Sequence, residues 1–131
     1  MARVTSLLAY VWAAPATGIG LLLALLALRG GRLAITHGVL EVHGPLVRRA
    51  LTRLTVVRGG VAAITFGHVV LGCDGDVLER SRTHERVHVA QYERWGLFFL
   101  PAYGVASVWA FLRGRDFYLD NCFEREARAK E

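Results

Sequence analysis

The chain has 131 residues, which is enough for one compact domain with an appendage and too few for a second catalytic domain. Apolar residues make up 53% of the chain and its mean hydropathy is +0.34, both high for a water-soluble domain of this size. The formal net charge of +5 comes mainly from arginine. Because no nucleic-acid recognition motif accompanies this charge, we expect no nucleic-acid partner.

A long uncharged segment near the N-terminus accounts for much of the hydropathy. It runs from Leu7 to Leu28, and at about 1.5 Å per residue a helix of this length crosses roughly 30 Å of hydrocarbon. We interpret it as a transmembrane helix, with residues 1–30 as an anchor and residues 31–131 as the main domain; a cleaved signal peptide is the alternative. Only Arg3 precedes the segment, whereas many arginines follow it. The positive-inside rule therefore predicts a single-pass protein with its main domain in the cytoplasm.

The next part of the chain carries strand signals on both sides of a short helix. β-branched residues and glycines predict two short strands, or one bent strand, between Arg32 and Gly44. Helical spacing of apolar residues, with arginines on the other side, predicts an amphipathic helix from Pro45 to Leu54. The nearly continuous apolar run from Val61 to Gly72 predicts one buried strand.

The following helix contains a pattern typical of metal sites. Asp76 has the capping-box spacing to Glu79, which predicts a helix from about Val77 to Arg94. Within it lies the sequence HERVH, whose two histidines are one helical turn apart on one face and can reach one ion. The glutamate between them is displaced by about 100° around the axis, so its carboxylate can approach a water on that ion. The alternative is a polar, solvated helix face.

The sequence HERVH, followed downstream by NCFEREA, resembles the gluzincin family of zinc metallopeptidases. These have an HExxH motif and a third ligand in an ExxA-type element on a later helix, and the nearest likeness is to short minigluzincin-like bacterial proteins. The resemblance implies a Zn²⁺ ion bound by His84, His88 and Glu124. It also implies that Glu85 is the general base and that Ala127 is the alanine of ExxA.

Several positions around this pattern leave alternatives open. Arg128 stands where the family often has an acidic residue, so the usual carboxylate partner of a ligand histidine is missing or supplied elsewhere. Glu126 is the alternative third ligand, although it points elsewhere on a helix for which Asn121 is a suitable N-cap. His68 and Tyr118 are candidates for contact with the substrate or the transition state, with structural packing as the alternative for both.

The zinc hypothesis constrains a second uncharged stretch, Trp95 to Leu112, which Pro101 interrupts. If this stretch crossed the bilayer once, Glu124 would lie on the opposite side from His84 and His88. We therefore expect a core helix packed on the motif helix, with two half-helices that bend at Pro101 and dip into the membrane as the alternative.

These elements together predict an α+β protein with an N-terminal transmembrane helix, a small β-sheet and a zincin-like helical core. With the resemblance, they predict a membrane-anchored zinc metallopeptidase of the bacterial inner membrane that hydrolyses a peptide or protein substrate, with Glu85 taking a proton from zinc-activated water. The alternative is a non-enzymatic, membrane-associated scaffold in which the same ligands hold a structural metal ion. The oligomeric state is not predicted.

Overall fold

The structure is a computed structural model of the chain, and it describes residues 2–53 and 61–131. It confirms the predicted α+β class. In chain order its elements are α1 (Ala2–Ala24), the 3₁₀ helix η1 (Leu25–Leu28), β1 (Arg32–Thr36), β2 (Val39–His43), α2 (Pro45–Arg53), β3 (Ala63–Phe66), β4 (Val69–Gly72), α3 (Gly75–Trp95), the 3₁₀ helix η2 (Gly96–Phe98), α4 (Phe99–Leu112) and α5 (Cys122–Lys130). Leu54, the predicted end of the amphipathic helix, lies outside the described residues.

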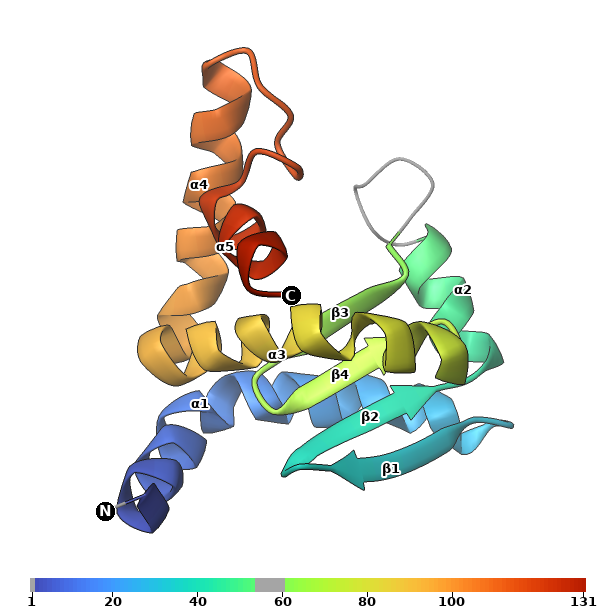
Figure 1. The fold of residues 1–131 in the computed structure, drawn as a ribbon. Coiled ribbons are helices and arrows are strands. Elements are labelled where there is room, and N and C mark those ends of the chain that lie inside the picture. The colour runs from blue at the N-terminus through green and yellow to red at the C-terminus, as the bar shows by residue number, and fades with distance from the viewer. Residues whose placement is uncertain (1, 54–60) are drawn as a thin grey trace.

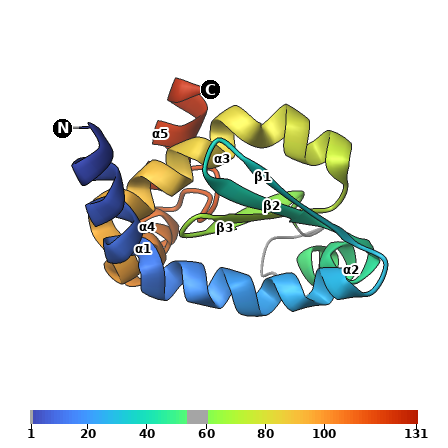
Figure 2. The ribbon, with the colours of Figure 1, turned by 90° about the horizontal axis from the view of Figure 1, so that it is seen from below.

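Within the described residues, a four-stranded mixed sheet in the order β1-β2-β4-β3 lies between two layers of helices. β2 and β4 run parallel, whereas β1 with β2 and β3 with β4 are antiparallel. α3 covers one face of the sheet, and α1 and α2 lie on the other (Figure 1 and Figure 2). Buried apolar side chains fill the space on both faces, among them Val39, Val70, Leu78 and Val89 under α3, and Ala24, Val42, Val47, Val69 and Leu71 under α1 and α2.

The two hairpins of the sheet agree only in part with the strands expected from the sequence. The pair of short strands predicted after Arg32 is confirmed, with His37 and Gly38 at positive φ in the turn. The single strand predicted from Val61 to Gly72 is wrong, because Gly67 (φ 61°) turns the chain and divides the run into β3 and β4. This turn makes β3 an edge strand and brings it beside the motif helix.

α1 and η1 pack through their small residues, with Ala13 and Ala16 against Tyr92 and Phe99 and the later alanines against the sheet. Ala13, Ala16, Ala24 and Ala27 are buried, and the nitrogen of Thr17 approaches Gly67 so closely that a Cβ there would come within 2.5 Å of it. The apolar run Leu7–Leu28, which comprises most of α1 together with η1, is long and apolar enough to cross a membrane, and a signal sequence would satisfy the same criterion.

α3 begins two residues earlier than predicted and is fixed to the sheet by an ion pair. Its N-cap is Asp74, which accepts a hydrogen bond from the Val77 N–H at 2.8 Å, so the predicted capping by Asp76 is wrong. Two nitrogens of the Arg82 guanidinium each donate to the buried carboxylate of Glu41 on β2 at 2.9 Å. This two-point contact fixes the position of α3 over the sheet, because its geometry is specific.

α4 is one continuous helix, so the alternative of two half-helices that bend at Pro101 is wrong. Proline is the third residue of α4, where a helix leaves backbone N–H groups unpaired in any case. The expected core helix is wrong as well, since only Phe99 and Ala110 on α4 are buried. Figure 1 shows α4 extending away from the sheet, after which the chain returns and α5 lies beside α3. Asn121 caps α5 as predicted, accepting from the Phe123 N–H at 2.9 Å.

Candidate metal centre

α3 and α5 bring together two histidines and a glutamate that are far apart in the sequence. His84 and His88 lie one turn apart on α3, and Glu124 lies in the first turn of α5. One ligand atom from each of the three residues falls within 4.8 Å of the others, a group that can hold a metal ion. Glu126, the alternative third ligand, is outside this group; its carboxylate instead pairs with Arg94 at 2.5 Å and with Lys130 at 3.4 Å.

The spacing of the donor atoms suits a tetrahedral ion. The Nε2 atoms of His84 and His88 lie 3.1 Å and 3.2 Å from the two carboxylate oxygens of Glu124. Ligands that each lie about 2.0–2.1 Å from a tetrahedral Zn²⁺ are about 3.3 Å apart, so each histidine already lies at this distance from one oxygen of Glu124, and the three ligand atoms, within 4.8 Å of one another, would draw closer to share one ion. The donor set of two imidazoles and one carboxylate is also one that zinc accepts in catalytic sites.

Neighbouring side chains orient the three groups. The Tyr103 hydroxyl on α4 donates to Glu124 at 2.7 Å. Gln91 is fully buried on α3; its amide oxygen lies 2.8 Å from His88 Nδ1, and its amide nitrogen donates to the Phe123 carbonyl at 3.1 Å. A proton on His88 Nδ1 leaves the lone pair on Nε2, which faces Glu124. Gln91 thus holds the ring of His88, and the Glu131 carboxylate, 2.8 Å from His84 Nδ1, is the carboxylate partner that the arginine at position 128 does not supply.

Replacement of Gln91 by Ala is expected to lower zinc affinity about 10- to 100-fold, because His88 loses the acceptor that fixes its ring. Gln91→Glu keeps an acceptor for His88 Nδ1 but turns its second carboxylate oxygen toward the Phe123 carbonyl, so it is expected to restore only part of the affinity. Competition with a chromophoric chelator measures both variants. If the alanine variant binds zinc as tightly as the wild type, Gln91 does not position His88.

Charge interactions within the group displace the pKa values of its members. The hydrogen bond to Glu124 is the main cause that raises the pKa of His84 to about 9, with a smaller contribution from Glu131. Burial by itself would raise the pKa of Glu124, but the hydrogen bonds from His84 and His88 outweigh it and hold that pKa well below its usual range. In the absence of a metal ion, the centre is therefore an ion pair between an imidazolium and a carboxylate.

Zinc affinity is expected to rise with pH in the neutral range. Zinc binds neutral imidazole, so below a pKa of about 9 the metal must displace a proton from His84. The apparent affinity should increase roughly tenfold per pH unit between pH 7 and pH 8, with about one proton released per ion. Calorimetric titrations in buffers of different ionisation enthalpy count that proton. An affinity that stays constant over this range would contradict the assignment of His84.

Glu85 lies on the same helix but makes different contacts. Its side chain is buried, and one carboxylate oxygen accepts a hydrogen bond from the Thr65 hydroxyl on β3 at 2.6 Å. Burial is the main cause that raises the pKa of Glu85 above its ordinary value. A carboxylate with a raised pKa is a stronger base, which suits a group that accepts a proton from water near neutral pH.

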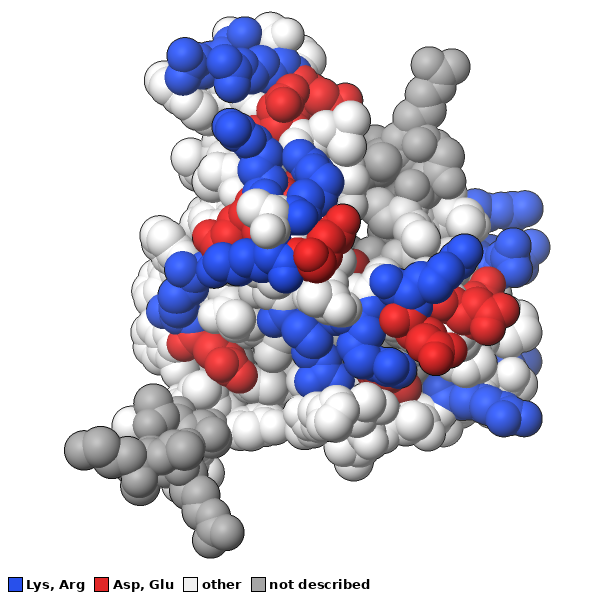
Figure 3. Space-filling model, viewed as in Figure 1, with Lys and Arg blue, Asp and Glu red and all other residues white. Residues whose placement is uncertain are grey.

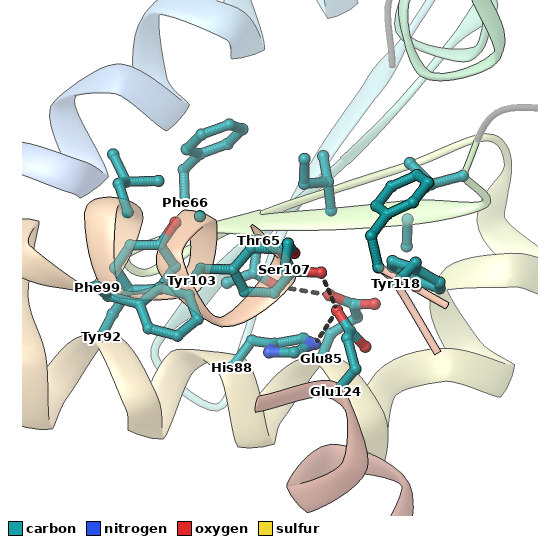
Figure 4. A pocket seen from close by; sticks show the side chains of 16 residues that line it. Thr65, Phe66, Glu85, His88, Tyr92, Phe99, Tyr103, Ser107, Tyr118 and Glu124 are labelled. Atoms are coloured by element: carbon teal, nitrogen blue, oxygen red, sulfur yellow. Dashed lines mark hydrogen bonds and ion pairs between the residues drawn. The ribbon is translucent and has the colours of Figure 1, made fainter. Parts of the chain in front are cut away.

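A cavity of about 510 Å³ lies between β3, α3 and α4 and borders the group. Figure 4 shows Glu85, His88 and Glu124 close together at one part of it, with Phe66, Tyr92 and Phe99 in another. The polar lining residues are few, and most of the others are apolar or aromatic: Val61, Ala63, Ile64, Phe66, Tyr92, Phe99, Leu100, Tyr103, Phe117 and Tyr118. Its volume lies in the range of about 300–1,000 Å³ that is usual for binding pockets.

The two remaining candidates lie in different places. Tyr118 lines the cavity, as a residue in contact with a substrate would. His68 does not line it; its imidazole lies at the β3–β4 turn, 2.8 Å from the Glu93 carboxylate and stacked on the Tyr10 ring.

Three residues that orient the group were not found from the sequence. Gln91 had a usable signal, because it lies one turn after His88 on the same helix face. Thr65 and Tyr103 had none, since their contacts join segments that are distant in the chain.

In comparisons with protein-family models, with curated proteins and with solved structures, no match to the chain was found.

Proposed function

We propose that this chain is a zinc-dependent metallopeptidase attached to a membrane. The single observation that supports it most is that two members of the group, His88 and Glu124, line a cavity that the buried Glu85 also lines. A purely structural zinc site is normally closed by four protein ligands, whereas a catalytic site has three and an open position. Cys122, a possible fourth ligand, is exposed and outside the group.

Each residue of the centre has a separate role in the proposed reaction. A bound Zn²⁺ ion supplies Lewis acidity, which lowers the pKa of a water and polarises a carbonyl. Glu85 accepts the proton from the attacking water, and the Thr65 hydroxyl holds its carboxylate in place. Tyr103 keeps Glu124 oriented toward the histidines. Tyr118, which lines the cavity, is the candidate to donate a hydrogen bond to the carbonyl oxygen as charge develops there.

The lining of the cavity indicates which substrates fit. Aromatic and aliphatic side chains bind bulky apolar groups, so the substrate is a peptide or protein segment with such a residue beside the scissile bond. Zinc-loaded protein incubated with a peptide library should cleave at such residues, and cleavage should stop on chelation and return when zinc is added. Stoichiometric zinc without cleavage would favour the scaffold alternative.

Gly104 offers a way to fill the cavity without touching the metal ligands. It lines the cavity on α4, and a Cβ at this position meets nothing within 4 Å. Gly104→Leu is expected to raise KM for peptides with a bulky apolar residue at least about tenfold while zinc content stays unchanged, since the added side chain takes the space of the substrate group. Replacing glycine within a helix also favours folding.

The adjacent residue supplies the matched control for this prediction. Val105 is exposed on α4 and does not line the cavity. Val105→Leu should therefore leave KM unchanged. Equal KM values for the Gly104 variant and the wild type would show that the substrate does not occupy the cavity.

The arginines that follow the apolar run support a location of the centre at the anionic cytoplasmic leaflet of the bacterial inner membrane. Only Arg3 precedes the apolar run Leu7–Leu28, and Arg29 and Arg32 follow it directly, with further arginines beyond. In this arrangement α1 attaches the chain to the membrane and the metal centre acts on substrates at the membrane surface.

A further inference from the structure

The distribution of residues around α1 is the reverse of that in a helix on the surface of a soluble protein. Alanines and a glycine contact the rest of the domain, and although Leu23 and Leu26 pack partly on the core, most of the large apolar side chains point outward. We call this outward set the outer stripe of α1; it consists of Leu7, Leu8, Val11, Leu21, Leu22 and Leu25. A helix on the surface of a soluble protein places its large apolar residues inward and its polar residues outward.

α1 is also attached to the rest of the domain at points along its length. The Tyr10 hydroxyl donates to the Gly38 carbonyl at 2.6 Å, and the Trp12 indole donates to the Arg94 carbonyl at 3.2 Å. Further along, Thr17 accepts from the His68 N–H at 3.0 Å. A helix held in this way cannot cross a bilayer lengthwise unless it detaches or carries the sheet into the hydrocarbon.

A second apolar stripe lies on α4. Val105, Val108, Trp109 and Leu112 recur at helical spacing and are all exposed, Leu112 by 72%. Two further exposed aromatic rings lie between the helices, since the Trp12 ring of α1 is 6.1 Å from the Phe98 ring just before α4. The opposite side of the molecule differs: Figure 3 shows both basic and acidic side chains spread over the face on which α3 and α5 lie.

Two observations favour lipid over a protein partner as the covering of these stripes. The outer stripe of α1 is aliphatic, and the polar groups of the exposed Tyr10 and Trp12 on the same helix already bond within the chain, whereas protein interfaces usually carry about one hydrogen bond per 100–200 Å². Arginine follows each stripe, Arg29 after α1 and η1 and Arg113 at the end of α4, the latter 5.6 Å above the Trp109 ring. Cations and tryptophans at the limits of an apolar surface suit lipid headgroups.

We propose that α1 contacts the bilayer side-on, with its outer stripe and the stripe of α4 in the acyl chains of one leaflet, while its alanine face stays on the sheet. Both ends of α1 then lie on the same side of the membrane, in contrast to the single crossing expected from the sequence. In this arrangement the cavity lies next to the membrane surface, because α4 residues line the cavity as well. Substrate segments at the membrane surface thereby reach the centre directly. This inference rests on the proposed membrane attachment and is independent of the metal.

Liposome flotation of the purified full chain tests the outer stripe. Leu22→Gln/Leu25→Gln changes two exposed residues, so folding is unaffected, but partition into anionic liposomes should fall at least about tenfold. The matched control is Leu33→Gln/Ile35→Gln, two exposed apolar residues on β1, which should float like the wild type. Equal flotation of the stripe variant, or an equal loss in the control, would overturn the proposal. A wild type that does not float would refute membrane attachment as a whole.

Thiol labelling in bacterial cells separates side-on contact from a lengthwise crossing. One variant carries only the exposed Cys122, and another carries only a cysteine introduced by Ala2→Cys. A membrane-impermeant maleimide is applied before and after permeabilisation. Side-on contact predicts that both positions label in the same condition. Labelling of one position in intact cells and of the other only after permeabilisation would establish a crossing and overturn the proposal.

Discussion

Replacement of Glu85 by Gln is expected to lower turnover at least about a thousandfold while the protein still binds one zinc ion per chain. The amide has the shape of the carboxylate and can accept the hydrogen bond from the Thr65 hydroxyl, so the centre keeps its structure. It cannot take a proton from water, and general-base catalysis contributes about 10²- to 10⁴-fold in enzymes. Peptide cleavage and zinc content measured on the same preparation separate the two effects.

Glu93→Gln is the control for this experiment. Glu93 lies on the same helix but pairs with His68 at the β3–β4 turn, away from the cavity. The Glu93→Gln variant should therefore retain full turnover. If the Glu85 variant cleaves peptides like the wild type, Glu85 is not the base, and if it loses zinc, the residue acts on metal binding instead.

Replacement of Glu124 by Gln is expected to lower zinc affinity more than any change outside the three ligands, by at least about 100-fold. The variant removes the negative charge that faces both imidazoles, and an amide is a much poorer ligand than a carboxylate. Loss of this charge also removes the main interaction that raises the pKa of His84, so that pKa should fall from about 9 toward its ordinary value. Chelator competition measures the affinity, and NMR titration of the metal-free protein measures the pKa.

Glu126→Gln is a closely matched control, because the same change is made two residues away on the same helix. Glu126 pairs with Arg94 and Lys130 at the surface, and exposed ion pairs of this kind contribute little. Zinc affinity should therefore stay within about threefold of the wild type. A larger loss in the Glu126 variant than in the Glu124 variant would reverse the assignment of the third ligand.

The features that sequence reasoning found depend on local spacing. Two histidines at i and i+4 project from one face of any α-helix, and Asn121 marks the start of the helix that carries Glu124. The two histidines of the candidate group therefore followed from spacing, whereas Glu124 came from the resemblance to the gluzincins, and the geometry of the group followed from neither. The orienting contacts of Thr65 and Tyr103 depend on how β3 and α4 pack against α3 and α5, which no spacing rule describes.

Two of the wrong predictions came from the apolar character of a segment, which was interpreted as a single strand in one case and as burial in the other. The apolar run around Val61 to Gly72 resembled one buried strand, yet Gly67 within it adopts positive φ and turns the chain. In α4, the absence of charge predicted burial, but hydropathy does not reveal whether protein or lipid covers a side chain. Trp109 and Leu112 are accordingly exposed in the folded chain although the apolar sequence predicted their burial.

Elemental analysis of the purified protein beside its His84→Ala variant tests the metal centre most directly. The account predicts about one zinc ion per wild-type chain and little in the variant, because two of the three ligands cannot replace the full set. Wild-type protein without stoichiometric metal, or a variant that retains it, would contradict the assignment of His84, His88 and Glu124 as a zinc site.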